Sequence, residues 1–159
     1  MRLFPGYCMD TSALIDLKPY FPETFSSLWK NIKNLISQGQ LAAPSEVFEE
    51  LKVKDDDLLK WAKAHKQMFK NLDQKQMQQM QRILRDFPNF VDPSKTIPEA
   101  DPFIVALALS EGYTVVTSEK PVDLNANPNA RPRIPDVCER LEVRCVSLRE
   151  FFNEQKWQF

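Results

Sequence analysis

Four acidic positions stand out in this sequence because of where they lie along the chain. Each stands at the end of an expected strand or on an early turn of an expected helix. Carboxylates gathered without basic partners repel one another, so a cluster of them persists most readily around a divalent cation. Carboxylate and water ligands suit Mg²⁺ or Mn²⁺, and a carboxylate-held Mg²⁺ commonly meets phosphates. The four positions are Asp10, Glu46 or Glu50, Asp101 and Glu119.

The first of these acids lie in the N-terminal third of the chain. The apolar run 7–9 ends on Asp10, and apolar residues then recur at helical spacing, which predicts a strand, an acid and a helix. A helix cap is the structural alternative for Asp10. A later helix from about Pro44 carries Glu46 and Glu50 on one face, because they are four residues apart. Glu46 could instead favour the helix dipole, and Glu50 could be an ordinary solvated acid.

The other two acids flank the most apolar part of the chain. Asp101 is expected to cap a helix with Pro102 at its first position, and this helix ends near Gly112. The β-branched run 113–117 predicts a buried strand that stops just before Glu119. Capping is compatible with a functional role for Asp101, since a carboxylate at a helix start keeps one oxygen free. Ligands bind outside the carboxyl ends of parallel strands, so these acids indicate a site at that edge.

Two segments between these elements have a different composition. Residues 52–87 are polar and carry two thin amphipathic stripes, which predict a helical hairpin inserted into the fold. Residues 120–133 are rich in proline and asparagine and predict a long surface loop. Arg131 and Arg133 in this loop could bind phosphates or could be solvated charges.

Strands alternate with helices along the whole chain, which favours an α/β fold with a parallel sheet of four or five strands. At 159 residues the chain is expected to form one domain over 1–159. The visible strands are expected over 7–9, 40–43, 113–117 and 143–146.

Composition excludes several classes of function. A net charge of −1 excludes a protein that coats nucleic acid nonspecifically, although a local basic patch remains compatible with it. With three glycines and one histidine, there is no glycine-rich phosphate loop and no mechanism that needs two imidazoles. Three cysteines without a Cys-x-x-Cys pair suggest reduced, intracellular thiols. Since no membrane span or signal peptide is evident, we expect a cytoplasmic protein without membrane contact.

In order and approximate spacing, four motifs resemble the PIN domain nucleases across nearly the whole chain. The region around 135–146 is similar to an uncharacterised PIN-like bacterial subfamily. The motifs are Met9-Asp10-Thr11-Ser12-Ala13-Leu14, Pro44-Ser45-Glu46-Val47-Phe48-Glu49-Glu50-Leu51, Ala100-Asp101-Pro102-Phe103-Ile104-Val105-Ala106-Leu107-Ala108 and Val115-Val116-Thr117-Ser118-Glu119.

The resemblance implies a three-layer α/β/α sandwich and an Mg²⁺- or Mn²⁺-dependent ribonuclease, and many relatives are VapC-type toxins of toxin–antitoxin pairs. Glu119 stands where many PIN domains have aspartate, so its contact with metal could be direct or through water. Ser12 and Thr117 match polar positions that support the acids or the scissile phosphate. Carried over by position, the acids that hold the metal are Asp10, Glu50 (or Glu46), Asp101 and Glu119.

The expected reaction is metal-assisted hydrolysis of an RNA phosphodiester, with products that carry 5′-phosphate and 3′-hydroxyl ends by the resemblance. An antitoxin protein and a second copy of the chain are the expected partners. A phosphatase with an aspartyl nucleophile is disfavoured, because Asp10 is followed two residues later by Ser12 instead of a second acid. A catalytically weak PIN-like module that binds RNA or a partner protein stays open as the alternative.

Overall fold

Strands that lie far apart in the sequence pair side by side in the computed structural model, which describes residues 6–96 and 99–159. They form a five-stranded sheet in the order β3-β2-β1-β4-β5, and every neighbouring pair is parallel. The α/β fold with a parallel sheet of four to five strands is therefore confirmed. The strands are β1 (Tyr7–Met9), β2 (Leu41–Pro44), β3 (Phe69–Lys70), β4 (Thr114–Val116) and β5 (Cys145–Val146).

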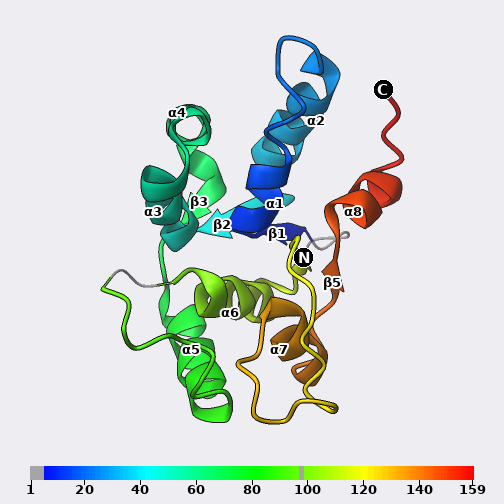
Figure 1. Cartoon of the computed structure of the whole chain (residues 1–159). Coiled ribbons are helices and arrows are strands. Elements are labelled where there is room, and N and C mark those ends of the chain that lie inside the picture. Colours follow the sequence, from blue (N-terminus) through cyan, green and yellow to red (C-terminus); the bar gives the residue numbers. More distant parts are fainter. Residues whose placement is uncertain (1–5, 97–98) are drawn as a thin grey trace.

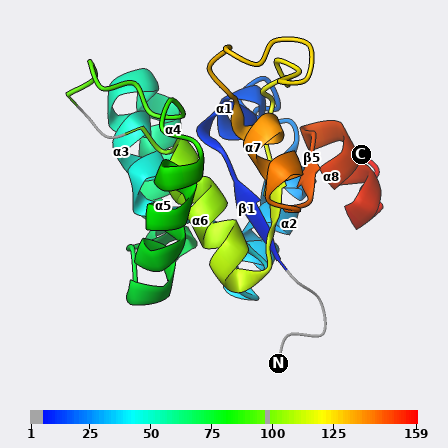
Figure 2. The same ribbon diagram turned by 90° about the horizontal axis from the view of Figure 1, so that it is seen from below.

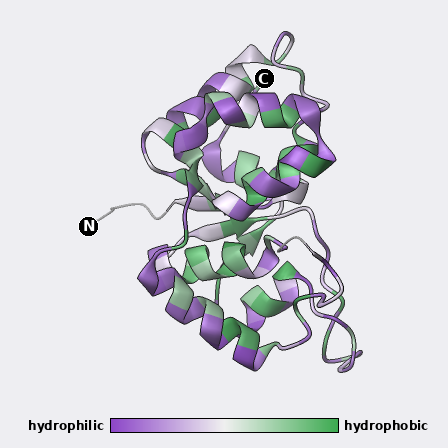
Figure 3. Ribbon diagram, turned by 90° about the vertical axis from the view of Figure 1, so that its left-hand side faces the viewer, coloured by the Kyte–Doolittle hydropathy of each residue, from purple (hydrophilic) through white to green (hydrophobic). Residues whose placement is uncertain are grey.

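Helices cover both faces of this sheet and complete three layers (Figures 1 and 3). In Figure 1, α5, α6 and α7 lie below the sheet, and α1 to α4 with α8 lie above it. A short 3₁₀ helix, η1 (Lys66–Met68), precedes β3. The helices are α1 (Thr11–Asp16), α2 (Ser26–Ser37), α3 (Ser45–Lys54), α4 (Asp56–Ala64), α5 (Gln74–Asp86), α6 (Asp101–Glu111), α7 (Ile134–Arg140) and α8 (Leu148–Gln155).

Helix α6 is the central helix of the lower layer. It contacts β1, β2 and β4 on one side, and α5 lies alongside it, as the view from below shows (Figure 2). Because neighbours surround it, α6 is apolar around most of its circumference, and its residues from Ile104 to Ala108 are buried. Gly112 ends the helix in the left-handed conformation, with φ of 71°. The start of α6 is thereby fixed at the carboxyl ends of β1 and β4.

The expected helical hairpin over 52–87 needs correction. The segment contains two helices, α4 and α5, but η1 and strand β3 stand between them, and the two helices lie on opposite sides of the sheet (Figure 1). The first amphipathic stripe, expected to run as a helix to Phe69, ends at Ala64. Its last two apolar residues lie beyond the helix. Met68 is buried in the core, and Phe69 pairs with Ala43 of β2.

Within the described residues, no helix is both long enough and apolar enough to cross a membrane.

The close approach of two strands at Gly6 provides a test of the sheet. A Cβ atom added at Gly6 would lie 2.7 Å from the carbonyl oxygen of Gln40, next to the point where Tyr7 N–H donates to that same oxygen. We expect Gly6→Ala to force β1 and β2 apart and to lower the free energy of unfolding by about 1–3 kcal/mol in urea titrations. Gly112→Ala is the control, since it has open space and costs about 1 kcal/mol through its positive φ alone. A Gly6→Ala protein as stable as wild type would contradict this packing.

Candidate active site

The predicted acids come from four separate elements that converge at the carboxyl edge of the sheet. Asp10 follows β1 directly, and Glu119 lies three residues beyond the end of β4. Asp101 is the first residue of α6, and Glu50 lies in the middle of α3. The topology thus brings together residues that are up to 109 positions apart in the sequence (119 minus 10).

Asp10 is buried and held by two hydroxyl groups. The residue is only 3% exposed. Its Oδ2 atom accepts hydrogen bonds from Ser12 Oγ at 2.7 Å and from Thr117 Oγ1 at 2.8 Å. Ser12 Oγ in turn accepts from the backbone N–H of Ser118 at 3.0 Å. Burial raises the pKa of Asp10, and the two hydroxyl donors oppose that rise. Asp10 occupies the cap position of α1 but makes no side-chain capping bond, so capping does not explain its placement.

Asp101 stands at the start of α6, close to the other three acids. Ala100, and not Asp101, is the cap residue of α6, so the capping role expected for Asp101 is wrong. Its side chain accepts no hydrogen bond from any residue that the structure describes. Burial, followed by the negative charges of Glu119, Asp10 and Glu50, raises the pKa of Asp101 to about 8. Without a cation nearby, Asp101 is therefore mostly protonated at neutral pH.

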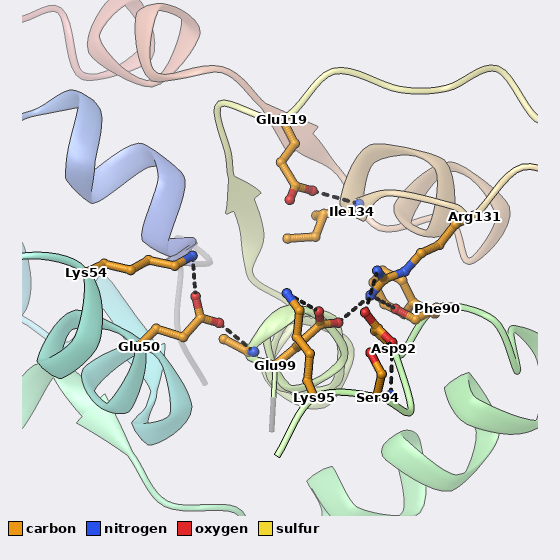
Figure 4. A network of polar contacts seen from close by, with 11 residues as sticks. Glu50, Lys54, Phe90, Asp92, Ser94, Lys95, Glu99, Glu119, Arg131 and Ile134 are labelled. Atoms are coloured by element: carbon orange, nitrogen blue, oxygen red, sulfur yellow. Dashed lines mark hydrogen bonds and ion pairs between the residues drawn. The ribbon is translucent and has the colours of Figure 1, made fainter. Parts of the chain in front are cut away.

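Glu50 joins these acids, whereas Glu46 does not. Glu50 Oε1 accepts the backbone N–H of Ala100 at 2.7 Å, which ties α3 to the start of α6. Its Oε2 atom forms an ion pair with Lys54 at 3.2 Å, one helical turn away (Figure 4). The charge of Glu50 contributes to the raised pKa of both Asp10 and Asp101. Glu46 bonds instead to the adjacent Ser45 hydroxyl, and burial raises its pKa.

Glu119 completes the acidic group. Its Oε2 atom accepts the backbone N–H of Ile134 at 3.1 Å, at the start of α7 (Figure 4). Its own backbone N–H donates to Thr117 Oγ1 at 3.1 Å, so the hydroxyl that holds Asp10 also fixes the chain at Glu119. Burial and the charge of Asp10 raise the pKa of Glu119, while the Ile134 N–H and Arg133 oppose the rise.

A pocket of about 650 Å³ opens above three of these acids. Glu50, Asp101 and Glu119 line it, and the more deeply buried Asp10 is not part of its lining. Both arginines expected to bind phosphate lie on its wall. Arg131 is paired with Glu99, whereas Arg133 makes one long hydrogen bond from Nη1 to the carbonyl of Lys120 at 3.4 Å.

Several residues of this pocket were not identified from sequence. Lys54, Lys95 and Glu99 also line it. The available signal was the spacing of opposite charges four residues apart, Glu50 with Lys54 and Lys95 with Glu99. Such spacing also occurs in ordinary surface pairs, so by itself it does not distinguish a site.

Asp136 was missed as well, and it anchors the loop that carries the arginines. It is 3% exposed, and its carboxylate accepts the backbone N–H groups of Val122 at 3.1 Å and of Arg133 at 2.9 Å. One buried side chain thereby closes both ends of the loop over 122–133. Its only signal in the sequence was an acid in the first turn of a helix.

The donor set fits a hard divalent cation, although the side chains as they stand do not enclose one. Over residues 6–96 and 99–159, no group of three or more His, Cys, Asp or Glu side chains is arranged to hold a metal ion. Nevertheless the charges of Asp10, Glu50 and Glu119 all act on the half-buried carboxylate of Asp101, to which none of the described residues donates a hydrogen bond. Oxygen donors of this kind suit Mg²⁺ or Mn²⁺.

Comparisons with known proteins cover most of the chain. A family model described as "Domain of unknown function (DUF4411)" matches residues 7–159. Among solved structures, a similar chain occurs in the crystal structure of VapBC2 from Rickettsia felis bound to a DNA fragment from their promoter. That match has 15% sequence identity and a TM-score of 0.48, and it covers 89% of this chain and 97% of that chain. Comparison with curated protein sequences found no match.

The raised pKa of Asp101 predicts how the stability of the metal-free protein depends on pH. Because Asp101 binds a proton more tightly when folded (pKa about 8) than when unfolded (about 3.9), the folded state holds more protons between these values. Stability should therefore fall as pH rises from about 4 to about 8. In EDTA at pH 9, Asp101→Asn should raise the melting temperature by several degrees, where about 1 kcal/mol corresponds to roughly 2–4 °C.

The matched control is Glu23→Gln, which removes an exposed acid from a loop. It should change the melting temperature by less than about 1 °C. A clear loss of stability in Asp101→Asn at pH 9 would contradict the electrostatic strain assigned to this carboxylate.

Proposed function

We propose that the chain, which belongs to the PIN-like family DUF4411, is a metal-dependent endoribonuclease. The observation that carries the proposal is the pocket itself, in which acids from α3, α6 and the segment after β4 face a basic wall. An RNA phosphate is repelled by such acids unless a cation lies between them. A divalent cation on the acids and arginines beside it together suit a phosphodiester.

Each acid has a defined role in this proposal. Asp10, Glu50, Asp101 and Glu119 would hold Mg²⁺ or Mn²⁺. When bound, such a metal would lower the pKa of a coordinated water and would offset the negative charge of the phosphate. Asp10 and Glu119 each have one carboxylate oxygen bonded to a neighbouring group, which fixes their direction, and both oxygens of Glu50 are engaged, by Ala100 N–H and by Lys54. Among the described residues, none donates a hydrogen bond to the Asp101 carboxylate.

The surrounding polar groups orient the acids and the substrate. Ser12 and Thr117 direct Asp10 by donating to its Oδ2 atom. Arg133, at the pocket wall and engaged only weakly by a carbonyl, is placed to bind a phosphate of the RNA. Arg131 is placed for a second phosphate contact. Because the pKa of Asp101 is raised to about 8, this carboxylate would have to lose its proton to hold a cation, so cation binding should strengthen as pH rises toward 8.

The biological setting that we propose is a toxin–antitoxin pair, with an antitoxin protein and a second copy of this chain as partners. This part of the proposal rests on the resemblance of the four motifs to VapC-type relatives. An adjacent gene for a small antitoxin-like protein supports it, and co-purification of the two products tests it.

A second function is favoured by one specific observation. Glu50 is occupied by Lys54 and by Ala100 N–H, and the described acids do not enclose a metal ion as they stand. A PIN-like module that binds RNA or a partner without cleaving it agrees with that arrangement. Tight retention of RNA by the wild-type protein, without cleavage in Mn²⁺, would favour this second function.

Metal binding should distinguish Glu50 from Glu46. If the four acids hold the metal, Mn²⁺ at about 100 times its Kd should stabilise the protein by about 2.7 kcal/mol, measured as a rise in melting temperature. Glu50→Gln should abolish most of that rise, because it removes one charged ligand. Glu46→Gln is the matched control on the same helix and should leave the rise intact. The reverse result would assign the site to Glu46.

Cleavage assays test the reaction itself. With Mn²⁺ and mixed RNA substrates, the wild-type protein should generate fragments with 5′-phosphate and 3′-hydroxyl ends, and EDTA should stop the reaction. Asp10→Asn and Asp101→Asn should each reduce the rate by about 10²-fold or more, because each removes a ligand charge that the metal needs. Cleavage that survives both substitutions would reject the assigned site.

A further inference from the structure

Glu99 lines the pocket but has no role among the proposed metal ligands. Its carboxylate binds two cations at once, Lys95 Nζ at 2.9 Å from Oε1 and Arg131 Nη2 at 2.5 Å from Oε2 (Figure 4). The Glu99 side chain is only 12% exposed, whereas those of Lys95 and Arg131 are 56% and 45% exposed. A largely buried acid therefore holds two half-exposed cations at the wall of the pocket.

Arg131 is fixed at one end of its guanidinium group. The same Nη2 atom that bonds to Glu99 also donates to the carbonyl oxygen of Phe90 at 3.3 Å. Nη1 makes a longer ion pair with Asp92 Oδ2 at 3.9 Å, while the other oxygen of Asp92, Oδ1, accepts from the N–H and hydroxyl of Ser94. Neither Nη1 nor Nε of Arg131 has a hydrogen-bond partner among the residues described. The fork of donors thus has one hydrogen-bonded end, and its other edge is free of hydrogen bonds and lies beside the Asp92 charge.

These contacts also join two loops at the pocket wall. Glu99 and Lys95 belong to the segment before α6, and Arg131 belongs to the loop that follows β4. A second contact between the same loops runs from Asn89 Nδ2 to the carbonyl of Ala130 at 3.5 Å. Of the contacts that Arg131 makes across these loops, the one with Glu99 is the shortest.

Charge alone argues against an acid at this position. Glu99 contributes one negative charge beside two positive ones, so it lowers the attraction of the wall for a polyanion. The Glu99 carboxylate instead restricts the conformation of Arg131. An ion pair with this largely buried acid limits a long side chain that would otherwise sample many rotamers.

We propose that Glu99 is a positioning residue, which holds Arg131, with Lys95 beside it, so that the free edge of the guanidinium binds an RNA phosphate next to the cleaved bond. This inference rests on the proposed function, since it takes RNA as the ligand of the pocket. It adds a residue whose effect on binding is opposite to that expected from its charge.

The test is the salt dependence of RNA binding. A labelled single-stranded RNA of mixed sequence is titrated with the full chain in Ca²⁺, used in place of Mn²⁺ to offset the charge of the acids without cleavage, at about 50 to 200 mM NaCl. Arg131→Gln should lower the slope of log K against log salt by about 0.7, the value for one phosphate contact. Glu99→Gln should weaken binding about threefold to tenfold with the same loss of slope, although it removes a negative charge. The double variant should bind no more weakly than Arg131→Gln alone.

Two controls separate positioning from other effects. Glu49→Gln breaks an exposed pair with Lys52 on α3, outside the pocket, and should not weaken binding. Glu99→Asp keeps the charge but shortens the arm, so positioning predicts weaker binding and charge alone predicts no change. Melting temperatures of all variants confirm that each compared protein is folded.

The outcomes also separate this inference from the proposed function. Tighter binding by Glu99→Gln, or additive effects of the two substitutions, would overturn the role of Glu99 while RNA binding stands. Failure of the parent protein to bind RNA in both Ca²⁺ and Mn²⁺ would overturn the proposed function and the inference together.

Discussion

The cost of charging carboxylates that are partly removed from water and lie near one another at the edge of one sheet is the constraint on which the rest of this site depends. Asp10, Glu50, Asp101 and Glu119 come from four elements. Desolvation raises the pKa of Asp10, Asp101 and Glu119, and repulsion adds to it, from Glu50 on all three, from Asp10 on Asp101 and Glu119, and from Glu119 on Asp101. In the metal-free protein Asp101 has a pKa of about 8 and so keeps its proton at neutral pH. A fold gains no stability from such an arrangement, which is why we assign it to cation binding.

The scaffold offsets this repulsion by fixing the acids through neutral donors. Two hydroxyls hold Asp10, and backbone N–H groups hold Glu50 and Glu119. These bonds run between elements, from α3 to the start of α6 and from the end of β4 to α7. The same contacts that orient the acids therefore also link the layers around the sheet, and α6, buried against β1, β2 and β4, keeps Asp101 in place.

Much of the fold and of the acidic group could be predicted from sequence, because buried strands and apolar helices have clear patterns whose boundaries mark Asp10, Asp101 and Glu119. Strand β3 was missed since Phe69 and Lys70 are too short a run to distinguish from a helix end. The preference for Glu50 over Glu46 came from the family resemblance, and the contact of Glu50 with Ala100, 50 residues away, adds an observation that no local pattern could supply. The part played by Glu99 depends on Arg131, 32 residues later, and no local pattern reveals such a pairing.

Proton release on metal binding tests the central claim most directly. Calorimetric titration of Mn²⁺ in buffers of different ionisation enthalpy measures the number of protons released per metal bound. If the carboxylates form one coupled cation site, about one proton or more should be released at pH 6.5 and markedly fewer at pH 9, because Asp101 has a pKa of about 8. Asp101→Asn should lose most of that release. Binding that releases no protons at pH 6.5, or release unchanged in Asp101→Asn, would contradict the account.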